Sequence, residues 1–251
     1  MRVYAIGDVH GHLDKLKDIH GRIAADRVRV NDPDALVVHV GDLVDRGPDS
    51  AGVISYLLDG MNAGKPWEAL RGNHDRLMSR FLDPARLRDQ LRNDLHWLQF
   101  SIGGSETLQS YGVDTNPDRG KEAIHADALA AVPQEHIAFL TAMPNVLAME
   151  GLYFVHAGIR PGVPLEEQVE DDLVWIREPF LSDPRDHGPL IVHGHSPVRS
   201  PVHYGNRLNI DSAAAYGGPL SGVVIEDGQV FLLGEEGREE LRPTAESYAT
   251  S

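Results

Sequence analysis

The sequence predicts an α/β fold, in which short buried strands alternate with longer helices. Apolar runs such as RVYAI (residues 2–6) and ALVVHV (residues 35–40) have the length and composition of buried strands, and helical patterns separate them. Several of these runs end in glycine next to a charged residue or a histidine. Because ligands of α/β sheets bind beyond the carboxyl ends of strands, this pattern places a candidate site at that edge of the fold.

The elements are expected in a definite order along the chain. Strands at 2–8 and 35–42 precede a helix at 50–64 that is capped by Asp49 and ends at a glycine. A weaker strand at 67–75 leads into a helix at 74–100, which is supported by leucines spaced four, four and three residues apart: Leu87, Leu91, Leu95 and Leu98.

The second half of the chain returns to strands. After a loop at 111–121 and a helix at 133–144, strand character appears at 152–158, 189–195 and 207–213. Residues 222–234 predict a β-hairpin that turns at Asp227-Gly228. We expect one domain over residues 1–234 with a helical insertion at about 76–145, followed by a loose polar tail at 235–251.

Composition limits the kinds of site that the chain holds. Its 251 residues include thirteen histidines and no cysteine, which excludes disulfides, thiol nucleophiles and cysteine-ligated metals. The formal charge of -15 disfavours binding to nucleic acids and anionic membranes. No apolar run approaches the roughly 20 residues that span a bilayer, and the N-terminus lacks the pattern of a secretory leader. We therefore expect a cytoplasmic protein.

Five predicted strands end in polar clusters: GDVHG, GDLVDRG, GNHD, VHAG and HGHSP. If these ends lie side by side, six side chains meet there: Asp8, His10, Asp42, Asn73, His156 and His195. Such mixed oxygen and nitrogen donors suit manganese, iron or zinc rather than calcium. Six ligands are too many for one catalytic ion, and they suit two ions about 3.5–4 Å apart with one carboxylate between them. Asp42 is the candidate for this bridge.

The same clusters carry groups suited to acid–base chemistry. Arg46 offers a planar, permanently charged group for phosphate oxygens. His74 offers a proton for a leaving oxygen, and Asp45 a carboxylate that orients the imidazole. Glycine-flanked acids are also common in turns, and helix capping alone accounts for Asp49.

In this order, the five motifs resemble those of the calcineurin-like metallophosphoesterases, and within them the bacterial and phage branch of the phosphoprotein phosphatase (PPP) family. The resemblance runs from Ile6 to about Gly234. It implies a two-sheet β-sandwich flanked by helices. It also implies two ligands for a first metal ion, one bridging ligand and three ligands for a second ion: Asp8 and His10, Asp42, and Asn73, His156 and His195.

Further roles follow from the resemblance. His74 and Asp45 would form the acid pair, and Arg46 would bind phosphate. Arg177, in VWIREPF, matches a second phosphate-binding arginine. His193 aligns with a position that is not a ligand. The loop NIDSAAAYGG departs from the family's IDTGA-x-x-GG, and the interval between the third and fourth motifs is long for the family.

Three functions remain open at this point. The preferred one is a phosphomonoesterase with two divalent ions, manganese first and iron or zinc as alternatives. It would be a serine/threonine or dual-specificity protein phosphatase, in which a metal-activated hydroxide attacks phosphorus. The alternative is a symmetrical diadenosine tetraphosphatase or another nucleotide hydrolase, although such hydrolases tend to read VARG where Asp45 stands here. The third is an inactive scaffold that binds phosphorylated partners, against which the complete ligand set argues. The expected partners are phosphoproteins, small phosphate esters or nucleotides.

Overall fold

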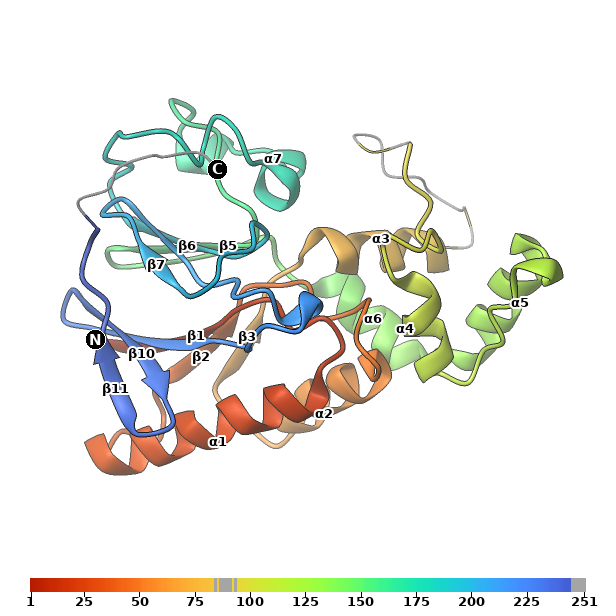
Figure 1. The fold of residues 1–251 in the computed structure, drawn as a ribbon, viewed down its shortest axis with the longest axis horizontal. Coiled ribbons are helices and arrows are strands. Elements are labelled where there is room, and N and C mark those ends of the chain that lie inside the picture. The colour runs from red at the N-terminus through yellow and green to blue at the C-terminus, as the bar shows by residue number, and fades with distance from the viewer. Residues whose placement is uncertain (84, 86–91, 93, 245–251) are drawn as a thin grey trace.

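The structure, a computed structural model of the full chain, describes residues 1–83, 85, 92 and 94–244. Two β-sheets lie face to face, and helices cover their outer faces (Figure 1). Strand order is β11-β10-β9-β1-β2-β3 in the first sheet and β4-β5-β6-β8-β7 in the second. The predicted class, an α/β fold with a two-sheet sandwich flanked by helices, is confirmed.

The strands of the first sheet are β1 (Arg2–Ile6), β2 (Leu36–His39), β3 (Trp67–Ala69), β9 (Gly222–Glu226), β10 (Gln229–Gly234) and β11 (Gly237–Glu240). Those of the second are β4 (Val146–Met149), β5 (Leu152–Val155), β6 (Leu190–His193), β7 (Val202–His203) and β8 (Arg207–Asn209). The α-helices are α1 (Leu13–Val30), α2 (Ser50–Asn62), α3 (Asn73–Leu82), α4 (Gly104–Ser110), α5 (Lys121–Ala131), α6 (Gln134–Ala142) and α7 (Glu170–Trp175). Short 3₁₀ helices are η1 (Pro117–Arg119), η2 (Leu165–Glu167) and η3 (Ala214–Tyr216).

Strand β1 is buried on both of its faces. Val3 and Ala5 pack between the sheets, where Phe154 of β5 joins the same cluster. Tyr4 and Ile6 point the other way, into the cluster beneath the helices. Side chains alternate between faces along a strand, so an unbroken apolar run marks a strand covered on both sides. This burial fixes β1, and therefore also fixes the position of the loop that follows it.

Helices α1 and α2 cover the outer face of the first sheet (Figure 1). The buried side chains Leu16, Ile19 and Ile23 of α1 repeat at spacings of three and four, which places them on one helical face. Helix α2 begins as predicted, because the Asp49 side chain accepts a hydrogen bond from the Gly52 backbone N–H at 2.8 Å. Among the described residues, no helix is long and apolar enough to cross a bilayer.

The prediction of one helix over residues 74–100 is wrong, because the helix that the structure shows there is shorter. Helix α3 ends at Leu82, and residues 94–103 form turns and loop. Asp83 has an extended backbone (φ -67°, ψ 128°) and precedes a proline, which disfavours helical geometry in the residue before it. Leu87 and Leu91 lie outside the described residues, whereas Leu95 and Leu98 pack against the core from turns. The leucine spacing is therefore not evidence of one continuous helix.

The segment after β10 contains a further strand. β11 pairs antiparallel with β10, so the expectation of a loose tail from residue 235 is wrong here. Arg238 of β11 binds Asp26 of α1 at 2.8 Å and Glu226 of β9 at 2.6 Å. The strand lies at the edge of the sheet, and edge strands commonly carry charged residues, which is why its sequence reads as a polar tail. Residues 245–251 lie outside the described residues.

Two buried histidines lie between α1 and β2. His20 Nε2 is 2.9 Å from His39 Nε2, and the two rings stack. Burial lowers the pKa of His20 to about 2 and that of His39 to about 4. Both values lie below the roughly 6.5 of an unfolded histidine. The unfolded chain therefore binds more protons, and stability falls as the pH drops below about 6.5.

We expect His39→Gln to reduce this loss of stability in acid. Glutamine keeps a polar group near the Glu68 carbonyl oxygen, which His39 Nδ1 contacts at 2.8 Å, but it cannot be protonated. Each excess proton bound by the unfolded state steepens the pH dependence by about 1.4 kcal/mol per pH unit. Urea denaturation of metal-saturated protein between about pH 7 and about pH 5 measures the slope. Equal slopes for the variant and the wild type would contradict the lowered pKa of His39.

Candidate active site

The loops that follow β1, β2, β3, β5 and β6 meet at one edge of the sandwich. β1 pairs parallel with β2, and β2 with β3, while β5 pairs parallel with β6 in the other sheet. Contacts join the two groups. The His195 backbone N–H donates to Asp8 Oδ2 at 3.0 Å, and His156 Nδ1 lies 3.0 Å from the Val40 carbonyl oxygen. The five strand ends singled out in the sequence therefore lie together.

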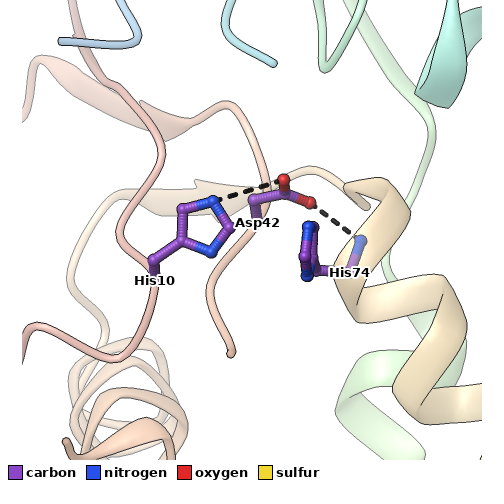
Figure 2. A group of neighbouring side chains, drawn as sticks. All are labelled: His10, Asp42 and His74. Atoms are coloured by element: carbon purple, nitrogen blue, oxygen red, sulfur yellow. Dashed lines mark hydrogen bonds and ion pairs between the residues drawn. The ribbon is translucent and has the colours of Figure 1, made fainter. Parts of the chain in front are cut away.

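Asp42 lies at the centre of this edge. Its Oδ2 is 3.6 Å from His10 Nε2 and 3.4 Å from His156 Nε2. Its Oδ1 accepts the His74 backbone N–H at 2.9 Å, so that Asp42 stands between the His10 ring and the first turn of α3 (Figure 2). Asp42 belongs to two sets of metal-ligating groups, one with His10 and His74 and one with His156 and His195, each spanning at most 4.8 Å. A carboxylate shared by two sets is what a bridging ligand requires.

The remaining predicted ligands lie beside these sets. Asn73 Oδ1 is 2.9 Å from His156 Nε2. Asp8 Oδ1 and His195 Nε2 are buried and have no hydrogen-bond partner in the described part of the chain. A buried polar atom without a partner costs free energy, and bound cations would satisfy these two atoms. The structure therefore brings all six predicted ligands together, in a form that fits divalent ions.

Two histidines are oriented as metal-binding histidines commonly are. His10 Nδ1 lies 2.9 Å from the Val44 carbonyl oxygen, and His156 Nδ1 lies 3.0 Å from that of Val40. A carbonyl oxygen only accepts, so each Nδ1 carries a hydrogen and each Nε2 is directed at Asp42. Metal-binding histidines typically donate their second N–H in this way.

The charges of the site favour a cation next to Asp42. Burial alone would lower the pKa of His156, yet the charge of Asp42 and a hydrogen bond to it raise this pKa to about 9. Burial would raise the pKa of Asp42, but His156 holds it well below its usual range. Burial lowers the pKa of His10 and of His195 well below their usual range. Without metal, a proton on His156 therefore supplies the positive charge that Asp42 requires.

Unfavourable backbone geometry is concentrated at the site. Among the described residues, eight other than glycine have a positive φ, and five of them have φ between 46° and 75° in the site: His10, Asp42, Asp45, Arg46 and His195. The left-handed region costs such residues roughly 1–2 kcal/mol each. Strained residues persist where the surroundings enforce them, and they cluster at functional sites. Here the Asp42 carbonyl oxygen accepts the N–H of His10 at 2.9 Å, which ties the first two loops together.

Two glycines allow the backbone to approach the central carboxylates. A Cβ added at Gly72 would fall 2.1 Å from Asp42 Oδ1, and one added at Gly194 would fall 1.9 Å from Asp8 Oδ1. Real Cβ atoms do not come this close to another atom, so only glycine fits at either position. The glycines of the GNHD and HGHSP motifs are therefore steric requirements of the ligand geometry.

His74 and Asp45 form a buried pair. Asp45 Oδ2 lies 2.7 Å from His74 Nδ1. Burial lowers the pKa of His74 to about 4 and raises that of Asp45 well above its usual range. Burial thus disfavours a net charge on the pair. His74 and Asp45 therefore keep one acidic proton that they share. His74 Nδ1 is occupied by Asp45, so Nε2 is the atom left for the pocket that His74 lines.

Both predicted arginines line the same pocket, whose volume is about 260 Å³. Arg46 NH1 lies 3.1 Å from His10 Nε2, and its guanidinium stands 5.1 Å from the centre of the Tyr216 ring. Arg177 NH2 donates to the His195 carbonyl oxygen at 3.3 Å. Two guanidinium groups therefore reach the cluster of candidate ligands from different loops.

Sequence reasoning missed several residues of the pocket wall: Arg92, Leu95, Ser101, Ile102, Trp175, Pro197, Asp211, Ala215 and Tyr216. Asp211 follows the end of β8, so the strand-end pattern would have found it. Trp175 ends α7, Ala215 and Tyr216 lie in η3, and the other five residues lie in turns and loops. His193 is buried against Phe180 and lies outside both metal-ligating sets of the described residues.

Comparisons with known proteins agree with this geometry. The calcineurin-like phosphoesterase family profile matches residues 1–220. The chain is 24% identical over 242 residues to the asymmetrical bis(5'-nucleosyl)-tetraphosphatase PrpE of Bacillus mycoides, covering 89% of this chain and 90% of that protein. The chain's fold also resembles two solved structures. One is a putative diadenosine tetraphosphatase (TM-score 0.62, 21% identity, 97% of this chain and 95% of that one). The other is the cold-active protein-tyrosine phosphatase of a psychrophilic Shewanella (TM-score 0.57, 17% identity, 96% of this chain and 80% of that one). The chain therefore belongs to the calcineurin-like phosphoesterase family of binuclear metal hydrolases.

Proposed function

We propose that the chain is a phosphomonoesterase that hydrolyses esters with poor leaving groups, such as phosphoserine and phosphothreonine in proteins. The buried His74–Asp45 pair, with its 2.7 Å contact, is the observation that carries this proposal. An alkoxide is a strong base, so its departure needs a proton from a positioned acid. A phosphate leaving group, as in a polyphosphate anhydride, is a weak base and departs without that help.

Six buried donors would hold the two divalent ions: Asp8, His10, Asp42, Asn73, His156 and His195. When bound, such a pair of ions activates water and offsets the charge of the phosphoryl group. The mixture of carboxylate, amide and imidazole donors suits manganese, iron or zinc, and manganese is our first choice.

The chain's own residues bind and protonate the substrate. Arg46 and Arg177 hold the phosphate oxygens through planar guanidinium groups, which remain charged at any working pH. His74 donates its proton from Nε2 to the leaving oxygen. Asp45 accepts from Nδ1, which keeps the imidazole in the tautomer and orientation for that donation.

A second candidate function is the hydrolysis of a dinucleoside polyphosphate. The curated relatives described above carry the name asymmetrical bis(5'-nucleosyl)-tetraphosphatase, whereas the sequence suggested the symmetrical type. A third arginine also favours this candidate. Arg92 lines the pocket, stands 5.4 Å from the centre of the Trp175 ring and pairs with the Asp94 carboxylate at 3.0 Å. An arginine next to an aromatic ring at the pocket wall suits the base or the longer polyphosphate chain of such a substrate.

Substitution of His74 tests the preferred function. We expect His74→Asn to lower kcat for a phosphoserine peptide by about 10²- to 10⁴-fold, and to lower it much less for p-nitrophenyl phosphate, because general-acid help matters most when the leaving group is a strong base. Steady-state kinetics on manganese-saturated protein measure both losses. Equal losses for the two substrates would remove His74 from the acid role.

The substrate class is decided by direct comparison. kcat/KM for phosphoserine, phosphothreonine and phosphotyrosine peptides is measured beside that for diadenosine tetraphosphate, on metal-stripped protein resupplied with manganese, iron or zinc. The preferred function predicts higher values for peptides. Higher values for the dinucleotide would put the second candidate in its place.

A further inference from the structure

Asp45 has two more partners that the proposed chemistry does not use. Trp97 Nε1 donates to both carboxylate oxygens, at 3.1 Å to Oδ1 and 3.0 Å to Oδ2. Thr107 Oγ1 donates to Oδ1 at 2.8 Å. Asp45 and Thr107 are 0% exposed and Trp97 is 3% exposed, so water does not compete for these bonds. The carboxylate therefore has a fixed set of donors.

Thr107 also holds the backbone of Asp45. The Asp45 N–H donates to Thr107 Oγ1 at 2.9 Å and to Ser50 Oγ at 3.1 Å. A hydroxyl group accepts and donates at once, so the one Thr107 oxygen binds both the backbone and the side chain of Asp45. The φ of Asp45 is 75°, an unfavourable value for this residue. The bonds from Thr107 and Ser50 help to enforce this conformation.

The segment that carries Trp97 and Thr107 is seated on the loop of Asp45 and Arg46. The Gly103 carbonyl oxygen accepts the Arg46 backbone N–H at 3.3 Å. A Cβ at Gly103 would fall 2.4 Å from the Arg46 nitrogen, and Gly103 has a φ of +93°. Only glycine permits this approach. Residues far from the metal-ligating motifs in sequence thus form part of the wall behind Asp45.

These contacts determine which way the carboxylate faces. Oδ1 is bound by Thr107 and Trp97, and Oδ2 is bound by Trp97 and His74. An indole N–H only donates hydrogen bonds. Trp97 therefore favours the ionised form of the Asp45 carboxylate, in which both oxygens accept. Burial raises the pKa of Asp45, and the hydrogen bonds from Thr107 and Trp97 oppose that rise. Loss of either donor would free the carboxyl group to rotate away from His74.

We propose that Trp97 and Thr107 are positioning residues, which hold Asp45 so that His74 presents its proton to the leaving oxygen. The inference rests on the proposed acid role of His74. It gives residues 97–107 a function in the reaction beyond shaping the fold.

Four single variants test the proposal. Trp97→Phe keeps an aromatic ring and removes the N–H. Thr107→Val keeps the shape of the side chain and removes the hydroxyl, while Thr107→Ser keeps the hydroxyl. Trp67→Phe is the matched control, because Trp67 packs against His20, His39 and Tyr56, away from the site.

We expect Trp97→Phe and Thr107→Val to lower kcat for a phosphoserine peptide by roughly 10- to 100-fold in manganese-saturated enzyme, the value of one hydrogen bond to a charged group. KM and kcat for p-nitrophenyl phosphate should change about twofold or less. Thr107→Ser and Trp67→Phe should retain wild-type values. A further Trp97→Phe change in His74→Asn should cost nothing more, because Trp97 acts through His74. Equal losses for both substrates, or additive losses in the double variant, would overturn the proposal.

A measurement without metal or substrate separates this proposal from the proposed function. The His74 Nδ1–H held by Asp45 should give a low-field proton NMR signal in the metal-free protein. The signal should weaken or shift in Trp97→Phe and Thr107→Val, and persist in Thr107→Ser and Trp67→Phe. An unmoved signal would overturn the positioning role even if His74 is the acid. A signal that moves, with no leaving-group dependence in His74→Asn, would instead overturn the acid role.

Discussion

Asp42→Asn is expected to lower kcat by roughly 10⁴-fold or more and to reduce the number of tightly bound metal ions. Asp42 is the residue that the two metal-ligating sets share, one with His10 and His74 and the other with His156 and His195. Asparagine keeps an oxygen for the His74 backbone N–H, which Asp42 accepts at 2.9 Å, but it carries no charge. Each ion stabilises the transition state by several kcal/mol, and each 1.36 kcal/mol corresponds to a tenfold rate.

Metal content and rate are measured on the same preparation. Elemental analysis after desalting should give two ions per chain for the wild type and fewer for Asp42→Asn. Asp49→Asn is the matched control. Asp49 follows in the same loop, its side chain accepts one backbone N–H, that of Gly52 at 2.8 Å, and asparagine accepts the same bond. Asp49 lies outside both metal-ligating sets of the described residues. An Asp42→Asn enzyme that keeps both ions and most of its activity would contradict the bridging role.

The ligand cluster could be predicted because each of its members follows a strand. Asp8 and His195 are 187 positions apart, yet the His195 N–H binds the Asp8 carboxylate. The apolar run of a strand and the polar residues at its end are local features of the sequence. Parallel pairing then brings such ends to one edge without any further signal. The chemistry of metal binding restricts the residue types, which makes the ends recognisable.

The support around Asp45 could not be predicted in the same way. Trp97 lies 52 positions from Asp45 and Thr107 lies 62, and both contacts depend on how the segment after α3 folds back. The sequence LHWLQF around Trp97 indicates only an apolar surface. The leucine spacing there favoured a helix, but Asp83 precedes a proline and its extended backbone ends α3. Tertiary packing, which local patterns do not encode, gives these residues their role.

Removal of both metal ions is expected to lower the melting temperature by roughly 16–32 °C. A ligand present at about 1,000 times its Kd stabilises the folded state by about 4 kcal/mol per site, and each kcal/mol shifts the melting temperature of a chain of this size by about 2–4 °C. The buried carboxyl groups are the reason why we expect cations to stabilise this fold. Burial and the charge of Asp211 raise the pKa of Asp8 well above its usual range. Burial and the charge of Asp42 raise that of Asp75 to about 7.

The fall in melting temperature on metal removal should become larger as the pH rises. The pKa of Asp75 is about 7 in the folded protein and about 3.9 for an unfolded aspartate, so between these values the folded state holds a proton that the unfolded state has released. The contribution of Asp75 to the stability of the metal-free protein therefore falls as the pH rises towards about 7. A bound cation favours the ionised carboxylates and removes this dependence. A bound cation also competes with the proton on His156. Because the pKa of His156 is about 9, this proton is lost as the pH rises towards that value, and the cation then binds more tightly.

Thermal unfolding with and without a chelator, from about pH 5.5 to about pH 8, measures the difference between the two forms. The difference should widen with pH. The buried pair of His20 and His39 lies away from the site and changes the stability of both forms equally with pH, so His39→Gln should leave the difference unchanged. A difference in melting temperature that stays constant or narrows as the pH rises would contradict the prediction that the cations stabilise the ionised carboxylates around Asp42.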